Sequence, residues 1–170
     1  MTKQEKYEAF LPQLQGLIDE TQQAVSVLAN VCAALHTEFG WWWTGFYLVD
    51  GDKLVLGPFQ GPVACYQIPF GRGVCGTAWK EQTTIVVTDV EEFPGHIACN
   101  SLSRSEIVVP VFNEEGAVCA VLDIDSKELA CFDETDRCYL EKAVSLLPKT
   151  FFVAQAICKK NQEKMDEVTK

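Results

Sequence analysis

Three cysteines lie beside turn-forming residues rather than inside apolar runs, which makes them candidates for chemistry. Cys65 stands in GPVACYQIPFG, Cys75 in GRGVCGTAW and Cys99 in FPGHIACNS. A structural cysteine behaves as a small hydrophobe and is typical of apolar segments. A thiolate is also a nucleophile, and in a reducing compartment any disulfide that it forms is transient and catalytic. We therefore take these three thiols as candidate nucleophiles or redox partners.

Cys75 has its own reason to be reactive. It follows the glycine turn GRG and comes at the predicted start of a helix. Unpaired N–H groups and the helix dipole favour an anion at that end. The position predicts a lowered thiol pKa, with an inert packed cysteine as the alternative.

The remaining five cysteines are assigned no chemistry. Three of them, Cys32, Cys119 and Cys158, lie in apolar periodic runs and are expected to fill the core. Cys131 and Cys138 lie just before and within the predicted C-terminal helix, and the sequence places no chemical partner near them.

Zinc and hydrolase sites are weak alternatives. Structural zinc sites usually take ligands from close pairs such as C-x2-C, and the sequence has only a single H-x-x-C formed by His96 and Cys99. A Cys-His-Asp hydrolase would need a histidine base, and the only other histidine, His36, lies on a predicted helix. We therefore predict no bound metal.

Three acids lie on two predicted strands. Glu106 begins EIVVPVF, and Asp123 and Asp125 end VLDIDS. Residues two apart on a strand share a face, so both aspartates should point one way and Ile124 into the core. Adjacent like charges raise one pKa and supply a carboxyl that can act as an acid near neutral pH. The other reading of this D-x-D is a solvated strand end.

Length and charge exclude several classes of protein. The 170 residues suit one domain, and the net charge of −10 argues against nucleic acid or anionic lipid as the main partner. The charged first twenty residues hold no signal peptide, and no apolar run reaches membrane-spanning length. We expect a cytoplasmic protein whose cysteines are largely reduced.

The rest of the chain supplies the elements that position these side chains. Two helices are predicted before residue 40, with Pro12 breaking or kinking the first. Apolar segments around the turns DGDK and NEEG predict hairpins, and a long C-terminal helix capped by Asp133 or Thr135 should kink at Pro148. We predict a single α+β domain over residues 1–170 with an antiparallel central sheet, terminal helices at about 3–39 and 133–165, and a catalytic core at about 41–132.

Three segments together resemble one family: GPFQGPVACYQIPFGRGVCGTAW, FPGHIACNSLSRSEIVVPV and VLDIDS. They are similar to the free methionine-(R)-sulfoxide reductases, which are stand-alone GAF-domain enzymes. The resemblance runs from Trp41 to Phe132, more than half of the chain. Three cysteines at this spacing, combined with SEIV and LDIDS, are more specific than a general GAF pattern.

The resemblance implies a GAF fold, an antiparallel sheet with helices on one side, often assembled as a homodimer. It implies reduction of free L-methionine (R)-S-oxide through a cysteine sulfenic acid and an intramolecular disulfide. No cofactor is implied beyond an external reductant of the thioredoxin type. Cys99 falls at the position of the attacking thiol, and Cys65 and Cys75 fall at recycling positions whose order stays open.

The same resemblance assigns the pocket. Glu106, Asp123 and Asp125 match its acids, and Trp43 in WWWTGFYLV matches its aromatic wall. These residue types suit the reaction, because an acid must protonate the oxygen that leaves when a thiolate attacks the sulfoxide sulfur. One carboxylate can also pair with the ammonium group of a free amino acid.

Two other classes of function compete with this one. A sensory GAF module that binds a small ligand, such as a cyclic nucleotide or a bilin, would explain the fold but not three turn-sited thiols. A scaffolding protein would explain neither the thiols nor the clustered acids.

Overall fold

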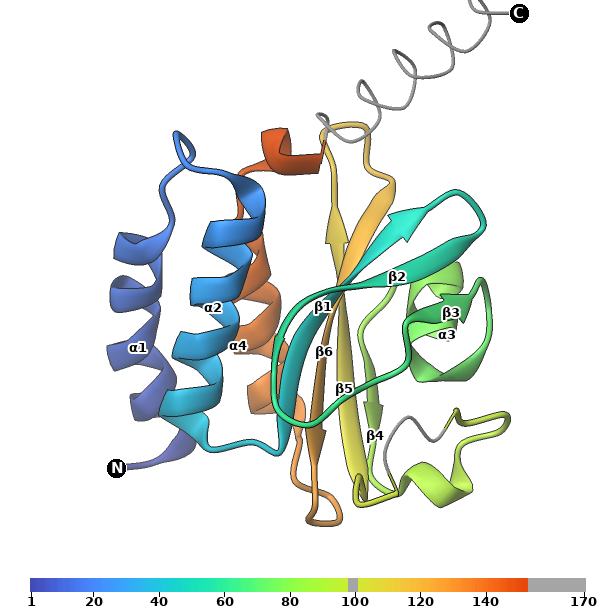
Figure 1. Ribbon diagram of the computed structural model, residues 1–170. Helices are drawn as coiled ribbons and strands as arrows, with labels where there is room; N and C mark the ends of the chain where they lie inside the picture. Colours follow the sequence, from blue (N-terminus) through green and yellow to red (C-terminus); the bar gives the residue numbers. More distant parts are fainter. Residues whose placement is uncertain (98–100, 153–170) are drawn as a thin grey trace, which may run out of the picture.

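The computed structural model describes residues 1–97 and 101–152 of the chain. Six strands form one sheet in the order β3-β2-β1-β6-β5-β4, and every neighbouring pair is antiparallel (Figure 1). The predicted antiparallel sheet is therefore confirmed. Its strands are β1 Trp43–Asp50, β2 Lys53–Gln60, β3 Gln67–Pro69, β4 Ile85–Val87, β5 Ser105–Phe112 and β6 Val118–Ser126.

Helices cover both faces of this sheet. Helices α1 (Lys3–Leu17), α2 (Ala24–Phe39) and α4 (Glu134–Ser145) lie on one face, and α3 (Gly73–Glu81) lies on the other (Figure 1). The helices on one side that the resemblance implied are thus present, and α3 adds a second layer against β5 and β6. None of the helices in the described ranges is long and apolar enough to span a membrane.

Helix α1 runs through Pro12 without a break, so of the two expectations for Pro12 the break is wrong. A capping box of Thr2 and Glu5 secures its first turn. Tyr7 and Leu14 are buried on either side of the proline. Packing of this stripe against the neighbouring helices offsets the hydrogen bond that proline cannot make.

The C-terminal helix is shorter than predicted. The side chain of Asp133 caps α4 by accepting from the N–H groups of Thr135 and Asp136, as expected. The helix ends at Ser145, ahead of Pro148, and a short 3-10 turn, η2 (Lys149–Phe152), follows. Pro148 ends the helix rather than kinking it, because the residue before a proline is disfavoured in the α conformation. The rest of the predicted helix lies outside the described residues.

The sheet divides the apolar side chains into two clusters. Ile107, Leu122 and Ile124 pack with α1, α2 and α4 on one face. Val74 of α3 packs on the other face, in a cluster that also contains Trp43. Because side chains alternate along a strand, the residues on either side of Ile124 point toward α3. This orientation is the one that the sequence predicted for the D-x-D pair.

Candidate active site

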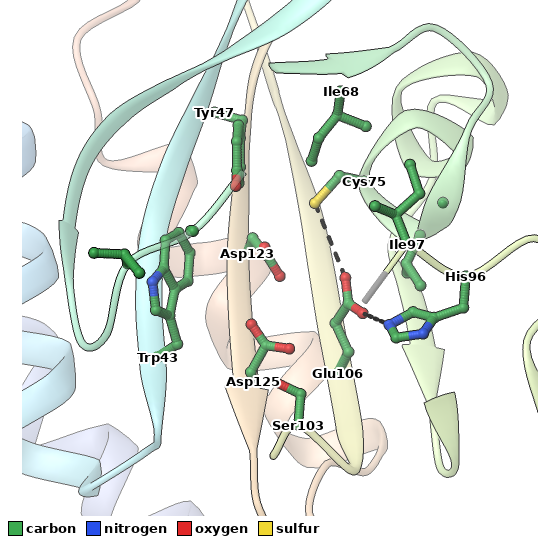
Figure 2. A pocket seen from close by; sticks show the side chains of 14 residues that line it. Trp43, Tyr47, Ile68, Cys75, His96, Ile97, Ser103, Glu106, Asp123 and Asp125 are labelled. Atoms are coloured by element: carbon green, nitrogen blue, oxygen red, sulfur yellow. Dashed lines mark hydrogen bonds and ion pairs between the residues drawn. The ribbon is translucent and has the colours of Figure 1, made fainter. Parts of the chain in front are cut away.

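One pocket lies between α3, the sheet and the loop that precedes β5 (Figure 2). Its cavity volume is about 40 Å³, above the roughly 10–15 Å³ that one water molecule needs. The lining contains four of the residues that the sequence predicted as substrate-binding or acidic. The fourteen lining residues are Trp43, Tyr47, Val63, Ala64, Ile68, Gly73, Val74, Cys75, His96, Ile97, Ser103, Glu106, Asp123 and Asp125.

The strand register brings the acids and the aromatic wall together. Glu106 on β5 is the direct partner of Asp125 on β6, and Asp125 is the direct partner of Trp43 on β1. These three residues form one row across three strands. Asp123 lies two residues before Asp125 on the same face of β6, and its direct partner on β1 is Gly45. The expectation that both aspartates share a face is confirmed.

Trp43 is held in a fixed orientation. Its indole Nε1 donates a hydrogen bond to the carbonyl oxygen of Pro62 at 3.0 Å, and its ring stacks on Phe59 at 5.3 Å. A Cβ atom built on Gly45 would lie 2.3 Å from the Trp43 ring. Glycine at position 45 therefore provides the space in which the indole lies beside the acids.

The pKa values of all three acids are raised, so each ionises less readily than usual. Glu106 and Asp123 are 5% and 7% exposed, and their pKa values are raised well above the usual range by burial and then by neighbouring carboxylates. Burial also raises the pKa of Asp125 to about 6, although a hydrogen bond from Ser103 opposes the shift. Carboxyl groups whose pKa values are raised toward or above neutral pH can deliver a proton to a leaving oxygen.

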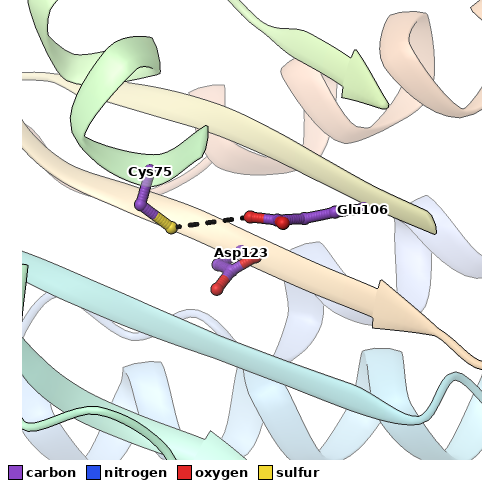
Figure 3. Close-up of side chains that lie close together, drawn as sticks. All are labelled: Cys75, Glu106 and Asp123. Carbon is purple, nitrogen blue, oxygen red and sulfur yellow. Dashed lines mark hydrogen bonds between the residues drawn. The ribbon is translucent and has the colours of Figure 1, made fainter. Parts of the chain in front are cut away.

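Cys75 lies against two of these acids. Its Sγ is 3.9 Å from Oε1 of Glu106, and ligand atoms of Cys75, Glu106 and Asp123 all lie within 4.8 Å of one another (Figure 3). Burial and these carboxylates raise the pKa of the Cys75 thiol well above its usual value. The prediction that the pKa of the Cys75 thiol is lowered is wrong, because desolvation and two nearby acids outweigh the dipole of α3.

Of the other two candidate thiols, Cys65 lies within the described residues and Cys99 does not. Cys65 is half-buried and disulfide-bonded, and its carbonyl oxygen accepts a hydrogen bond from the hydroxyl of Tyr47 at 3.0 Å. Cys99, the predicted nucleophile, lies outside the described residues. The free cysteines of residues 1–97 and 101–152 are Cys32, Cys75, Cys119, Cys131 and Cys138.

The cysteines predicted as core filler fit that role where they are described. Cys32 is buried and Cys119 is half-buried, and burial raises the pKa of each thiol to about 12. Thiols of this kind are almost wholly protonated at neutral pH and are poor nucleophiles. Cys158 lies outside the described residues.

Three polar residues of the pocket were missed from the sequence. Nε2 of His96 lies 3.8 Å from Oε2 of Glu106, and burial lowers the His96 pKa. Tyr47 and Ser103 also line the pocket. Tyr47 could have been found, because it lies four residues after Trp43 and so shares its strand face. His96 and Ser103 lie on irregular loop backbone, where no periodicity indicates which way a side chain points.

Comparison with known proteins supports the same family. A family model described as a GAF domain matches residues 21–147. The GAF domain-containing protein A of Dictyostelium discoideum is 54% identical over 147 residues, which cover 86% of this chain and 92% of that protein. The free methionine-R-sulfoxide reductase of Escherichia coli is 41% identical over 152 residues, covering 88% and 90% of the two chains.

A solved structure of a similar protein also superimposes closely. The free methionine-R-sulfoxide reductase from Neisseria meningitidis, in complex with its substrate, has a TM-score of 0.86 and 53% sequence identity. The match covers 92% of this chain and 95% of that one. This degree of identity and coverage, together with the match to the GAF domain, shows that the chain belongs to the free methionine-R-sulfoxide reductase family of GAF-domain proteins.

Proposed function

We propose that this protein reduces free methionine R-sulfoxide to methionine. One observation carries the proposal: Glu106, Asp123 and Asp125 lie beside Trp43 in one pocket, and burial raises the pKa of all three acids. Such a pocket offers acids for a sulfoxide oxygen and an aromatic face for a methylated sulfur. The reductases of Escherichia coli and Neisseria meningitidis that the chain resembles carry the same activity in their names.

Recognition of the free amino acid is assigned to the acids and the indole. Oδ1 of Asp123 is buried and has no hydrogen-bond partner among the described residues, so an ammonium group placed there would gain a charge-assisted hydrogen bond. The face of Trp43 can accept the methyl-sulfur end of the substrate, a contact worth roughly 0.3–1.5 kcal/mol. Together these contacts select a small zwitterion over a side chain in a protein.

The chemical step is assigned to Cys99 and to a protonated carboxyl. The Cys99 thiolate attacks the sulfoxide sulfur, and Glu106 or Asp125 protonates the oxygen as the S–O bond breaks. The attack joins Cys99 to the substrate sulfur, and this S–S bond breaks when the released oxygen, as water, adds to the Cys99 sulfur. Methionine leaves with its sulfur reduced by two electrons, and Cys99 is left as a sulfenic acid. The geometry of Glu106 beside His96 supports this role, since the imidazole can return a proton to the acid.

The cycle closes through a disulfide. A second thiol condenses with the sulfenic acid of Cys99, which forms the S–S bond and releases the oxygen as water. A cytosolic dithiol of the thioredoxin type then restores both thiols. No other cofactor is needed, because the two thiols supply both electrons.

We assign the second thiol to Cys65 rather than to Cys75. Cys65 is already disulfide-bonded, which supports a redox role, whereas Cys75 is free, buried and held protonated beside Glu106. In this assignment Cys75 contributes to the pocket wall without changing its oxidation state. A homodimer in the cytoplasm stays a prediction.

The deciding experiment separates reduction from simple ligand binding. The protein is incubated with the R or the S epimer of free methionine sulfoxide and dithiothreitol, and methionine is measured by amino-acid analysis. We expect methionine from the R epimer alone, at the same rate in the exposed-cysteine control Cys138→Ser. Binding of either epimer without methionine formation would favour a sensory GAF module instead.

A further inference from the structure

We propose that Cys75, Glu106 and Asp123 form a binding site for a soft divalent cation, with Zn²⁺ as the best fit. The three residues come from α3, β5 and β6, so no sequence segment contains two of them. Spacing along the chain therefore predicted no metal site, although the fold brings the three ligand groups together (Figure 3). The ion would be an inhibitor of the pocket rather than a cofactor of the reaction.

The distances fit a small coordination sphere. One ligand atom from each of the three residues lies within 4.8 Å of the other two, and Sγ of Cys75 is 3.9 Å from Oε1 of Glu106. Tetrahedral zinc with bonds of about 2.3 Å to sulfur and 2.0–2.2 Å to oxygen separates its ligands by roughly 3.5 Å. Side-chain adjustments of about 1 Å would therefore complete the three bonds.

The fourth ligand would be a water molecule. Nε2 of His96 lies 3.8 Å from Oε2 of Glu106, on the side of that carboxylate away from Cys75, so the imidazole is not part of the three-residue cluster (Figure 2). A water molecule can fill the remaining position, since the cavity exceeds the volume of one water.

The charges of the pocket favour a cation. Oδ1 of Asp123 is buried and unpaired within the described chain, and the pocket lining there includes no lysine or arginine. A bound divalent ion would displace the protons of Cys75 and the acids and offset their charges. One thiolate beside two carboxylates suits Zn²⁺ better than Mg²⁺ or Ca²⁺, which prefer oxygen ligands alone.

Metal and substrate should exclude each other. The ion would occupy Glu106 and Asp123, the groups assigned above to the sulfoxide oxygen and the ammonium group. This consequence depends on the proposed function, whereas metal binding itself does not. Zn²⁺ should therefore raise the KM for free methionine R-sulfoxide without changing kcat, and a chelator should reverse the effect.

The binding test uses Co²⁺, a spectroscopic substitute for zinc. The full-length protein is kept oxidised, so that the Cys65 disulfide removes that thiol from the competition, and is titrated with Co²⁺. We expect about one equivalent to bind, with a thiolate-to-cobalt absorption band in the near ultraviolet that Cys75→Ser abolishes. The matched controls Cys119→Ser and Cys138→Ser should keep the band. An equal band in wild type and Cys75→Ser would overturn the site.

Two further variants keep the test decisive if Cys75→Ser does not fold. Asp123→Asn and Glu106→Gln should each weaken Co²⁺ binding at least about tenfold, while Glu115→Gln in the exposed β5–β6 turn should not. Unchanged affinity in both pocket variants would contradict the proposal. Co²⁺ bound through Cys75 in a protein that forms no methionine would refute the proposed function alone. Methionine formation without this metal binding would refute the metal site alone.

Discussion

Glu106 and Asp125 lie directly opposite each other on the adjacent strands β5 and β6. Side chains in such a pair have Cβ atoms roughly 4.5–5.5 Å apart, and like charges there are unfavourable. The pair is tolerated because protonation of Glu106 removes one of the two charges: the pKa of Glu106 is raised well above its usual range, whereas that of Asp125 is raised to about 6. A slip of β6 by one residue would turn Asp125 into the apolar core.

The first prediction concerns the roles of the thiols. Cys99→Ser should abolish methionine formation, because no other thiol is proposed to attack the sulfoxide. Without reductant, Cys65→Ser should still release about one methionine per chain and leave a sulfenic acid on Cys99 that dimedone traps. Quantification of methionine and mass spectrometry of the peptides measure both outcomes.

Cys75 supplies the comparison for that experiment. Cys75→Ser should form the Cys65–Cys99 disulfide after one turnover, because its thiol is given no redox role. A full single turnover by Cys99→Ser, or a trapped sulfenic acid in Cys75→Ser, would reverse the assignments.

The second prediction concerns thiol reactivity in the resting protein. Cys138 is exposed, whereas Cys32 is buried with its pKa raised to about 12, and the pKa of Cys75 is also strongly raised. Iodoacetamide at neutral pH should therefore modify Cys138 well before Cys32 or Cys75, since only the thiolate reacts. Peptide mapping against time provides the measurement, and unfolding in urea should make all three react. Early modification of folded Cys75 would show that its thiol is not held protonated.

The third prediction concerns the pH dependence of stability. The folded pKa of Asp125 is about 6, against roughly 3.9 for an unfolded chain. The folded state therefore holds this proton more tightly, and the stabilisation is complete below pH 4 and lost as the pH rises through about 6. The loss is about 2–3 kcal/mol of unfolding free energy.

Replacement of the acid tests this assignment. Asp125→Asn should remove that part of the decrease between about pH 4 and pH 6, measured by urea unfolding at a series of pH values. The exposed control Asp52→Asn should follow the wild-type profile. Parallel profiles for wild type and Asp125→Asn would show that Asp125 ionises normally in the fold.

The fourth prediction concerns the space at Gly45. A Cβ atom at this position would lie 2.3 Å from the Trp43 ring and 2.5 Å from Cβ of Phe59. Gly45→Ala should therefore displace the indole, lower the unfolding free energy by about 1–3 kcal/mol and raise the KM for the substrate. Denaturant unfolding and steady-state kinetics measure the two effects.

Gly16 offers the matched control. It lies in α1, and nothing is within 4 Å of a Cβ atom built there. Gly16→Ala should leave KM unchanged and increase stability by up to about 1 kcal/mol, because alanine is the better helix former. An unchanged KM in Gly45→Ala would mean that the Trp43 ring does not position the substrate.

The fifth prediction concerns selectivity for the free amino acid. Acetylation of the substrate's amino group removes a charge-assisted hydrogen bond, worth about 1.5–3 kcal/mol, to Asp123. N-acetylmethionine sulfoxide should therefore lose at least about tenfold in kcat/KM. Asp123→Asn should narrow the gap between the two substrates, whereas the exposed control Glu115→Gln should preserve it. Equal kcat/KM for both substrates would indicate an open site that repairs proteins.

Local features of the sequence determined most of the elements. The alternation around Ile124 predicted which way Asp123 and Asp125 point, and Asp133, one of the two predicted caps, does cap the last helix. These features depend on neighbours within a few residues, so pattern and propensity suffice. The resemblance of the motifs to one family extended this prediction to Trp43 and Glu106, both of which line the pocket.

Only the tertiary structure decided the state of Cys75. The start of a helix predicted a lowered thiol pKa, but the fold buries this thiol against Glu106, which is 31 residues away, and raises the pKa instead. The same packing brought His96 to Glu106, and it let α1 continue through Pro12. The ionisation of a side chain depends on lost solvent and on charges that distant strands deliver, and a local pattern encodes neither.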